Sequence, residues 1–201
     1  MTVRIVAEAG VNHNGDLATA LRMVDLAAEA GADAVKFQTF DPAALVTPDA
    51  EPADYQKRNA PGTVSQRAML EGLRLDAAAH RALLDRCAAR GIAFLSTPFD
   101  PASLALLLEL GVPALKLSSG DLTNGPLLLA AARSGRELIL STGMATLAEV
   151  EDALAVIAFG LLAPPDARPG RAAFRRAYAE ARAADALAAR VTLLHCVTEY
   201  P

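Results

Sequence analysis

Six apolar runs in this chain each end at a polar side chain that can take part in chemistry. Glu8 ends the first run, and lysine, glutamine, serine, threonine or cysteine lies at or near the end of each later one. The runs are residues 5–8, 34–38, 93–97, 115–119, 138–142 and 193–196. In a parallel α/β barrel, substrates bind at the C-terminal ends of the strands. We therefore expect these polar groups to form one site.

Lysine is rare here and is found at two of these strand ends. The chain has three lysines, Lys36, Lys57 and Lys116, beside sixteen arginines. Lysine supplies a compact charge for phosphate or carboxylate, or an amine that forms a Schiff base, and arginine replaces neither role well. The plainer alternative is a lysine whose charged end only reaches solvent. Two lysines in matching positions favour a ligand over that alternative.

Two serine-containing turns follow the fourth and fifth runs. They are Ser118-Ser119-Gly120 and Ser141-Thr142-Gly143. Hydroxyl and backbone N–H groups near a helix start bind phosphate oxygens. Each turn alone is weak evidence, but beside two lysines the pair predicts a phosphorylated and carboxylated ligand.

The stretches between the runs have helical spacing and helix-ending residues. We expect helices over 17–30, closed by Gly31, and over 77–90, capped by Asp76 and closed by Gly91. Further helices are expected after Asp100-Pro101, after Thr146 with Glu149 up to about Gly160, and over 171–189 as an outer insertion. Apolar strands alternating with helices indicate a parallel sheet buried on both faces, in a barrel or a doubly wound fold.

Composition excludes several functional classes. The chain has 201 residues, 53% of them hydrophobic, and a formal charge of −4, which suits one sizeable core and not a nucleic-acid surface. No run approaches the roughly 18 apolar residues of a membrane helix. Nothing at the N-terminus suggests secretion, and two separated cysteines, Cys87 and Cys196, suit a reducing cytoplasm without a disulfide.

Six ordered motifs resemble the sialic acid synthase family, which includes N-acetylneuraminate and legionaminate synthases. The motifs are AEAGVNHNG (7–15), VKFQTF (35–40), FLSTPFD (94–100), KLSSGDLTN (116–124), ILSTGM (139–144) and LHCVTEYP (194–201). The resemblance covers nearly the whole chain apart from the insertion at 161–189. It implies condensation of phosphoenolpyruvate with an N-acetylated aldose, either N-acetylmannosamine or a diacetylated 6-deoxy relative. The products would be a nine-carbon 2-keto sugar acid and phosphate.

The resemblance also implies an α/β fold, a (β/α)8 TIM barrel, with about the first six strand-helix units in this chain. Residues 1–201 would then be an incomplete N-terminal catalytic barrel domain, without strands seven and eight and the C-terminal antifreeze-like domain. Family members are homodimers that use a divalent metal, Mn2+ or Mg2+. Its ligands are expected beyond Pro201, so we expect this stretch alone to be inactive. Membrane and nucleic-acid partners are not expected.

Site residues carry over from the family position by position. Glu8 is expected to move a proton during catalysis, although the alternative is a structural pair with a strand-end lysine. Lys36 and Lys116 are expected to be catalytic and to bind phosphoenolpyruvate. The other positions expected to bind phosphoenolpyruvate are Ser119, Ser141 and Thr198, and those expected to bind the sugar are Gln38, Asn59, Thr97, Asp121 and Tyr200. Asp121 is one methylene shorter than the glutamate of some members, which leaves the sugar open.

The three histidines form no recognisable metal site in the sequence. We expect His80 to face solvent, His13 to fix the loop after the first strand by hydrogen bonds, and His195 to be a hydrogen-bonded core residue.

Two other functions remain open at this point. Lys116 could serve as the Schiff-base nucleophile of an aldolase on the same barrel, although this would explain neither Lys36 nor the serine turns. Alternatively, the chain could bind phosphoenolpyruvate without turnover.

Overall fold

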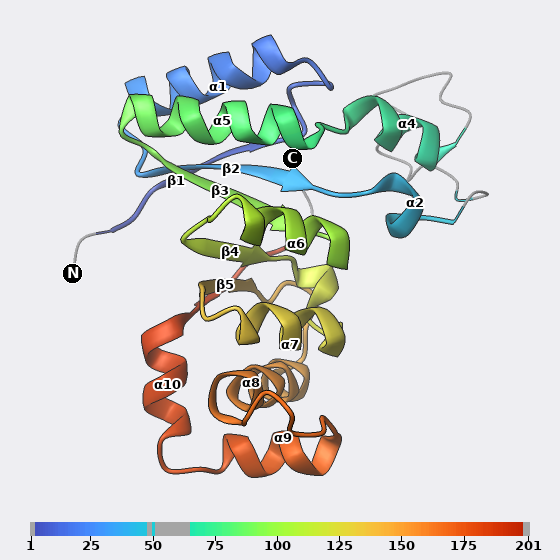
Figure 1. Cartoon of the computed structure of the whole chain (residues 1–201), viewed down its shortest axis with the longest axis vertical. Coiled ribbons are helices and arrows are strands. Elements are labelled where there is room, and N and C mark those ends of the chain that lie inside the picture. Colours follow the sequence, from blue (N-terminus) through green and yellow to red (C-terminus); the bar gives the residue numbers. More distant parts are fainter. Residues whose placement is uncertain (1–2, 48–49, 51–64, 199–201) are drawn as a thin grey trace. The chain divides into compact units, whose positions relative to one another are not determined.

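The computed structural model describes residues 3–47, 50 and 65–198. The chain divides into two compact units, Met1–Leu110 and Gly111–Pro201. Each unit contains a parallel three-stranded sheet with helices packed against it (Figure 1). The units are described separately below.

Unit 1 has the sheet order β1-β2-β3, and both strand pairs are parallel. Its elements are β1 (Val6–Gly10), α1 (Leu17–Glu29), β2 (Ala34–Thr39), α2 (Pro42–Leu45), α4 (Gln66–Leu73), α5 (Ala77–Arg90), β3 (Ala93–Pro98) and α6 (Pro101–Glu109). The connection that follows β2 begins with α2, and residues 51–64 lie outside the described part of the chain.

Helix α5 begins and ends, and helix α6 begins, at the residues that the sequence indicates. The Asp76 side chain accepts a hydrogen bond from the Ala79 backbone, and Gly91 closes α5 with a φ of 66°. That left-handed conformation is one that glycine adopts without a steric cost. Asp100 caps α6 and Pro101 occupies its first turn. These boundaries are therefore confirmed.

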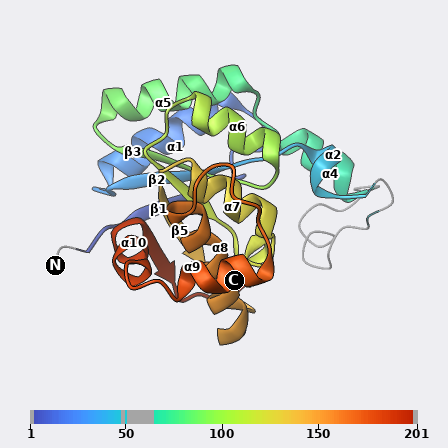
Figure 2. The same cartoon turned by 60° about the horizontal axis from the view of Figure 1, so that its bottom comes forward.

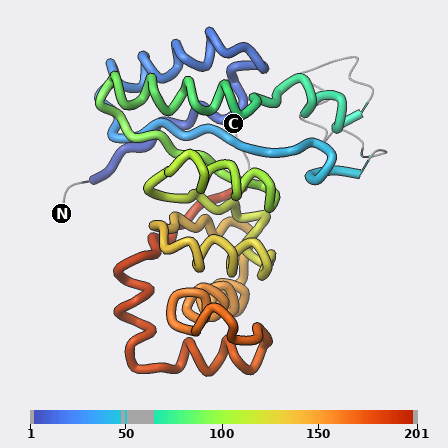
Figure 3. Tube along the Cα trace, in the orientation of Figure 1, coloured from blue at the N-terminus to red at the C-terminus, as the bar shows by residue number. Residues whose placement is uncertain are grey.

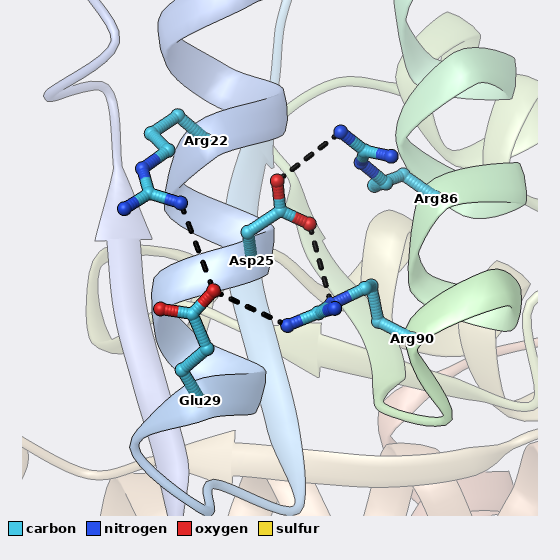
Figure 4. A network of polar contacts seen from close by, with 5 residues as sticks. All are labelled: Arg22, Asp25, Glu29, Arg86 and Arg90. Carbon is cyan, nitrogen blue, oxygen red and sulfur yellow. Dashed lines mark hydrogen bonds and ion pairs between the residues drawn. The ribbon is translucent and has the colours of Figure 1, made fainter.

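Helices α1 and α5 run side by side along one face of the sheet of unit 1 (Figure 1). Val24 of α1 and Leu83 of α5 are fully buried, as is Phe37 of β2. At the outer surface, five charged residues join the two helices (Figure 4). They are Arg22, Asp25, Glu29, Arg86 and Arg90, with N···O distances of 3.1 to 3.7 Å. Such exposed pairs contribute little individually, so the apolar contacts hold the two helices together.

Unit 2 has the sheet order β4-β5-β6, again with parallel pairs. Its elements are β4 (Ala114–Leu117), the 3-10 helix η1 (Ser119–Asp121), α7 (Gly125–Arg133), β5 (Glu137–Ser141), α8 (Leu147–Leu162), α9 (Arg171–Tyr178), α10 (Ala183–Arg190) and β6 (Val191–Leu194). Thr146 and Glu149 form the expected capping box of α8. Leu115, Leu138 and Leu140 are among its most buried side chains.

One expectation for unit 2 is confirmed and one is wrong. Helix α8 ends at Leu162, near Gly160 as expected. A Cβ at Gly160 would lie 2.5 Å from the Cβ of Ala132 in α7, so glycine here allows α7 and α8 to approach closely (Figure 2). The single helix expected over 171–189 is two helices, because the chain turns sharply between α9 and α10 (Figure 3).

The parallel α/β organisation expected from the sequence is confirmed. Closure of the strands into a TIM barrel remains a prediction. No helix in the described ranges is long and apolar enough to cross a membrane. Cys87 and Cys196 are both free thiols, as expected.

The hydrogen bonds of Asp100 should contribute to the stability of this fold, and a substitution can test this. Its side chain is 3% exposed. It accepts hydrogen bonds from the backbone of Ser103 (2.8 Å), the hydroxyl of Ser103 (2.6 Å) and the backbone of Asp41 (2.8 Å). Asp100→Ala should therefore lower the free energy of unfolding by about 2–4 kcal/mol in urea titrations, through loss of the cap and of buried hydrogen bonds. Asp76→Ala, which removes one cap bond, should cost about 1 kcal/mol. Equal losses of unfolding free energy in the two variants would show that the additional hydrogen bonds of Asp100 do not stabilise the fold.

Candidate active site

One face of the sheet of unit 1 carries four of the predicted site residues. The register pairs Glu8 with Lys36 and Gln38 with Thr97. Partners in adjacent strands project from the same face, and so do residues two apart on one strand. The Lys36 ammonium forms an ion pair with the Glu8 carboxylate, and their side chains are 13% and 34% exposed. The alternative for Glu8, an ion pair with a strand-end lysine, is therefore present in the structure.

A bulge in β1 sets the position of Glu8. The register shifts between Glu8 and Gly10, and Gly10 has a φ of 55°. A Cβ at Gly10 would lie 3.1 Å from the Glu8 carboxylate and 3.9 Å from the Gln38 amide. Bulges often redirect a side chain next to a site. Glycine here leaves the space in which Glu8 and Gln38 lie.

The opposite face of this sheet holds a buried hydrogen-bond chain centred on His80. His80 is completely buried, so the expectation that it faces solvent is wrong. Its Nδ1 lies 2.9 Å from the Asp76 carbonyl oxygen, and its Nε2 lies 2.8 Å from the Thr39 hydroxyl. Because a carbonyl can only accept, Nδ1 carries the proton and Thr39 donates to Nε2. Ser96, 2.7 Å from Thr39, then donates to Thr39.

This chain of hydrogen bonds lies directly behind the polar face. Thr39 follows Gln38 on β2, and Ser96 precedes Thr97 on β3. Burial lowers the pKa of His80, and its contacts with Asp76 and the main chain of Gln38 oppose this effect without reversing it. The neutral imidazole therefore fixes β2 against β3 where Gln38 and Thr97 emerge.

The expectation for His13 is confirmed, whereas the expectation for His195 is wrong. His13 is buried and its Nδ1 accepts a hydrogen bond from the Gly15 backbone at 3.0 Å, which confirms its loop-fixing role. Burial, with a smaller contribution from His80, lowers the pKa of His13. His195 lies just beyond β6 and is exposed, so the expectation of a core position is wrong.

In unit 2, the C-terminal ends of three adjacent strands converge on Gly143. The Gly143 N–H donates to the Ser119 hydroxyl at 2.9 Å. A Cβ at Gly143 would lie 2.7 Å from the Thr198 methyl, 3.1 Å from Ser119 Oγ and 3.2 Å from the Cys196 carbonyl oxygen. A side chain at this position would therefore displace Thr198 and crowd Ser119. The predicted anion-binding residues Ser119 and Thr198 lie together here, next to the turn that begins at Ser141.

The Cys196 thiol lies among these same groups, and the sequence analysis did not select it. Its Sγ is 3.6 Å from Ser119 Oγ. Partial burial, the largest single influence, raises the pKa of the thiol, but hydrogen bonding brings it below its ordinary value. Among the described residues, the hydrogen-bond contact of this sulfur is the one with Ser119. The N–H groups of Thr142 and Gly143 donate to the Leu194 carbonyl and to Ser119 Oγ.

The two remaining predicted residues of unit 2 are partly or largely buried. Lys116 is 8% exposed and its ammonium donates to the Leu117 carbonyl at 2.9 Å. It pairs in register with Ile139, two residues before Ser141, so it projects from the face that carries Ser141. Burial raises the pKa of Asp121, and a hydrogen bond from Asn124 partly opposes this change.

Two predicted site residues, Asn59 and Tyr200, lie outside the described residues. Within the described ranges, no three or more His, Cys, Asp or Glu side chains form a group that could hold a metal ion. The described residues thus form two sets. Unit 1 offers a carboxylate–ammonium pair beside amide and hydroxyl groups, and unit 2 offers hydroxyl, N–H and ammonium donors suited to an anion.

Comparison with known proteins identifies the family. A model of the NeuB family matches residues 23–201. The chain is 42% identical over 197 residues to the N,N'-diacetyllegionaminic acid synthase of Campylobacter jejuni, covering 98% of this chain and 52% of the relative. It is 41% identical over 201 residues to the enzyme of the same name from Legionella pneumophila, covering 100% and 50%. The chain therefore belongs to the NeuB family, and it spans about half the length of these curated relatives.

A solved structure agrees with this assignment. The N-acetylneuraminic acid (sialic acid) synthetase of Leptospira borgpetersenii, in complex with citrate, matches with a TM-score of 0.71 and 31% identity. The match covers 99% of this chain and 56% of that one. The recognition made from the six motifs is thereby confirmed.

The buried histidine predicts a pH dependence of stability. Because the folded state lowers the pKa of His80, the unfolded chain binds a proton first as the pH falls below about 6.5. The free energy of unfolding should be greatest above that pH and should decrease as the pH falls below it. The pKa of His13 is also lowered, so His13 should add to this decrease. Between pH 6.5 and 5.5, His80→Gln should make the unfolding free energy depend less steeply on pH. The slope should fall by at most about 1.4 kcal/mol per pH unit.

Urea titrations at several pH values measure this slope. His195→Gln, which changes an exposed histidine, is the matched control and should leave the slope unchanged. An unchanged slope in His80→Gln would contradict the assignment of His80 as a buried neutral base.

Proposed function

We propose that this chain takes part in joining phosphoenolpyruvate to an N-acetylated aldose, with release of phosphate. The convergence of Ser119, Gly143 and Thr198 at the strand ends of unit 2 is the observation that carries this proposal. Membership of the NeuB family and the legionaminic acid synthase names of its relatives support it. Both substrates are of the class that the sequence motifs imply.

Unit 2 would bind the anionic part of phosphoenolpyruvate. Hydroxyl groups of Ser119, Ser141 and Thr198 can donate to phosphate or carboxylate oxygens. The Gly143 N–H donates to the Ser119 hydroxyl and so orients it. Lys116 adds a positive charge in a largely buried position, where charge-assisted hydrogen bonds are strong. Glycine at 143 leaves room for Ser119 and Thr198 to lie against the main chain.

Unit 1 would assist the transfer of charge and protons. Lys36 can neutralise an oxyanion, and Glu8 can pass a proton when its pairing with Lys36 is exchanged for contact with substrate. Gln38 and Thr97, on the same face, offer amide and hydroxyl groups that would orient the bound substrates.

The proposed reaction forms one carbon–carbon bond and breaks one carbon–oxygen bond. The methylene carbon of phosphoenolpyruvate attacks the aldehyde carbon of the open-chain sugar, and the aldehyde oxygen takes a proton. Water adds to the resulting cation at C2 and loses a proton, which leaves a hydroxyl at C2. The C2–O bond to phosphate then breaks as that hydroxyl passes its proton to the departing phosphate, which leaves the ketone. Within the described residues no group of side chains matches the divalent metal that the family resemblance implies. The residues named here are proposed to bind and orient the substrates and to move protons.

The acceptor is proposed to be N-acetylmannosamine or a diacetylated 6-deoxy relative. The names of the two relatives at 41% and 42% identity favour the diacetylated sugar. Asp121 would contact sugar hydroxyls. No observation favours the Schiff-base aldolase, since the Lys116 ammonium is already engaged by a carbonyl oxygen.

Phosphoenolpyruvate binding tests the anion-binding role. Lys116→Met and Lys36→Met should each weaken phosphoenolpyruvate by roughly ten- to a hundredfold in calorimetric titrations, since each removes a charge-assisted contact of about 1.5–3 kcal/mol. Arg176→Met removes the same charge from the exposed face of α9 and should leave affinity unchanged. Equal affinity in the wild type and both lysine variants would contradict the proposal.

The role of Glu8 has a separate test. Glu8→Gln keeps the size of the side chain but cannot exchange a proton, so substrate binding should persist while turnover decreases by about 10²–10⁴-fold. Phosphate release from phosphoenolpyruvate and the acceptor sugar measures turnover, and calorimetry measures binding. If the variant loses stability while its folded fraction has normal turnover, Glu8 is only a structural partner of Lys36.

A further inference from the structure

A buried hydrogen-bond chain in unit 1 joins a helix to the two strand ends that carry predicted sugar-binding residues. It runs from Ser96 on β3 through Thr39 on β2 to His80 on α5. The exposed fractions of these residues are 0%, 4% and 0%, so almost no water competes for their hydrogen bonds. An unpaired member of such a buried chain is costly, and each link therefore restrains its neighbours.

The orientation of the His80 ring is fixed by contacts at its two nitrogens and at its edge. Its Nδ1 donates to the Asp76 carbonyl oxygen, which leaves Nε2 as an acceptor for the Thr39 hydroxyl. The ring packs edge-on against Phe94 of β3, with centroids 6.5 Å apart and an interplanar angle of 88°. Because Asp76 is the cap of α5, the imidazole connects the start of this helix to the end of β2.

The end of β2 lies directly behind two predicted sugar-binding side chains. The ladder between β2 and β3 extends to Thr39 and its partner Pro98. Gln38 and Thr97 each lie one residue earlier on these strands and project from the opposite face. A displacement of Thr39 would therefore displace the main chain from which Gln38 projects.

We propose that His80 is a positioning residue for the acceptor sugar: acting through Thr39, it fixes where the Gln38 and Thr97 side chains lie. The identity of the ligand as an N-acetylated sugar rests on the proposed function. The restraint of the strand ends by His80 does not. His80 lies on the far face of the sheet and takes no direct part in binding or chemistry.

The effect should be selective for the sugar, because the residues proposed to bind phosphoenolpyruvate have other restraints. Lys36 pairs in register with Leu95 in the interior of the ladder, and its ammonium is paired with Glu8. In unit 2, the Ser119 hydroxyl is held by the Gly143 N–H. Loss of the His80 contact should therefore weaken the sugar more than phosphoenolpyruvate.

Two substitutions at His80 separate positioning from packing. His80→Gln offers an amide oxygen that can accept from the Thr39 hydroxyl, whereas His80→Leu fills the space without an acceptor. In both variants the Asp76 carbonyl keeps the main-chain N–H of residue 80 as a partner, at 3.0 Å in the wild type. Leu83→Val removes only apolar atoms from the same buried stripe of α5, so it is the control for lost stability.

Steady-state phosphate release with the sugar varied, at about pH 7.5 where a free imidazole is neutral, measures the functional effect. His80→Leu should raise the KM for the sugar about five- to tenfold, the equivalent of one orienting hydrogen bond. Its kcat should change less than about twofold, since no proton-moving group is lost. His80→Gln should restore most of the wild-type KM, and Leu83→Val should leave it unchanged.

Thr39→Val tests whether His80 acts through the Thr39 hydroxyl. It should raise the KM for the sugar as His80→Leu does, and the double variant should be no worse than either single variant, because both changes break one contact. Thr39→Val carries the same test if His80→Leu does not fold. By calorimetry, the Kd for phosphoenolpyruvate should stay within about twofold of the wild-type value in every variant.

Amide hydrogen exchange measures the restraint itself and needs no substrate. The Phe99 N–H donates to the Thr39 carbonyl at 3.1 Å, and the Asp41 N–H donates to Asp100 at 2.8 Å. In His80→Leu, exchange at these two amides should accelerate about tenfold relative to amides in the middle of β2, and His80→Gln should largely reverse the change.

The proposal is wrong if His80→Leu leaves either the sugar KM or this local exchange unchanged, if it weakens sugar and phosphoenolpyruvate equally, or if Leu83→Val has the same effect. Failure of the proposed function gives a different result. A wild type that releases no phosphate from the two substrates contradicts that function, and exchange at Phe99 then decides the restraint alone. A wild type that turns over, with a His80→Leu variant like it in KM and exchange, contradicts only the role of His80.

Discussion

The parallel register of neighbouring strands is the constraint on which both candidate sites depend. In unit 1 it places Glu8 beside Lys36 and Gln38 beside Thr97. In unit 2 it brings the ends of β4, β5 and β6 together, where Thr142 donates to the Leu194 carbonyl through its hydroxyl at 2.9 Å and its backbone at 3.1 Å. A shift of one residue in any strand would move these side chains to the helix-covered face.

Buried contacts on the far face hold this register. In unit 1, the hydrogen bonds from Ser96 through Thr39 to His80 connect β3, β2 and α5. In unit 2, Leu138 and Leu140 of β5 are buried, and Gly160 allows α8 to approach α7 closely. Stability and chemistry are thus divided between the two faces of each sheet.

Local signals in the sequence predicted most helix boundaries, because caps and closing glycines act within a few residues. Asp76 and Gly91 are clear examples. The end of α8 near Gly160 was predicted in the same way, but the close approach of Gly160 to Ala132 involves a neighbouring helix that local spacing does not reveal. The burial of His80 could have been predicted, because His80, Leu83 and Cys87 lie on one helical stripe and all three are buried.

The site was predicted from the types of residue at the strand ends and from family motifs. Those signals pointed to Ser119 and Thr198, which the structure places together at Gly143. They did not point to Cys196, whose sulfur lies 3.6 Å from Ser119 Oγ. A crystal structure of the chain with phosphoenolpyruvate tests the central claim most directly. Our account predicts phosphate or carboxylate oxygens within hydrogen-bond distance of Ser119 and the Gly143 turn. Phosphoenolpyruvate bound elsewhere, with these groups making no contact with it, would contradict the account.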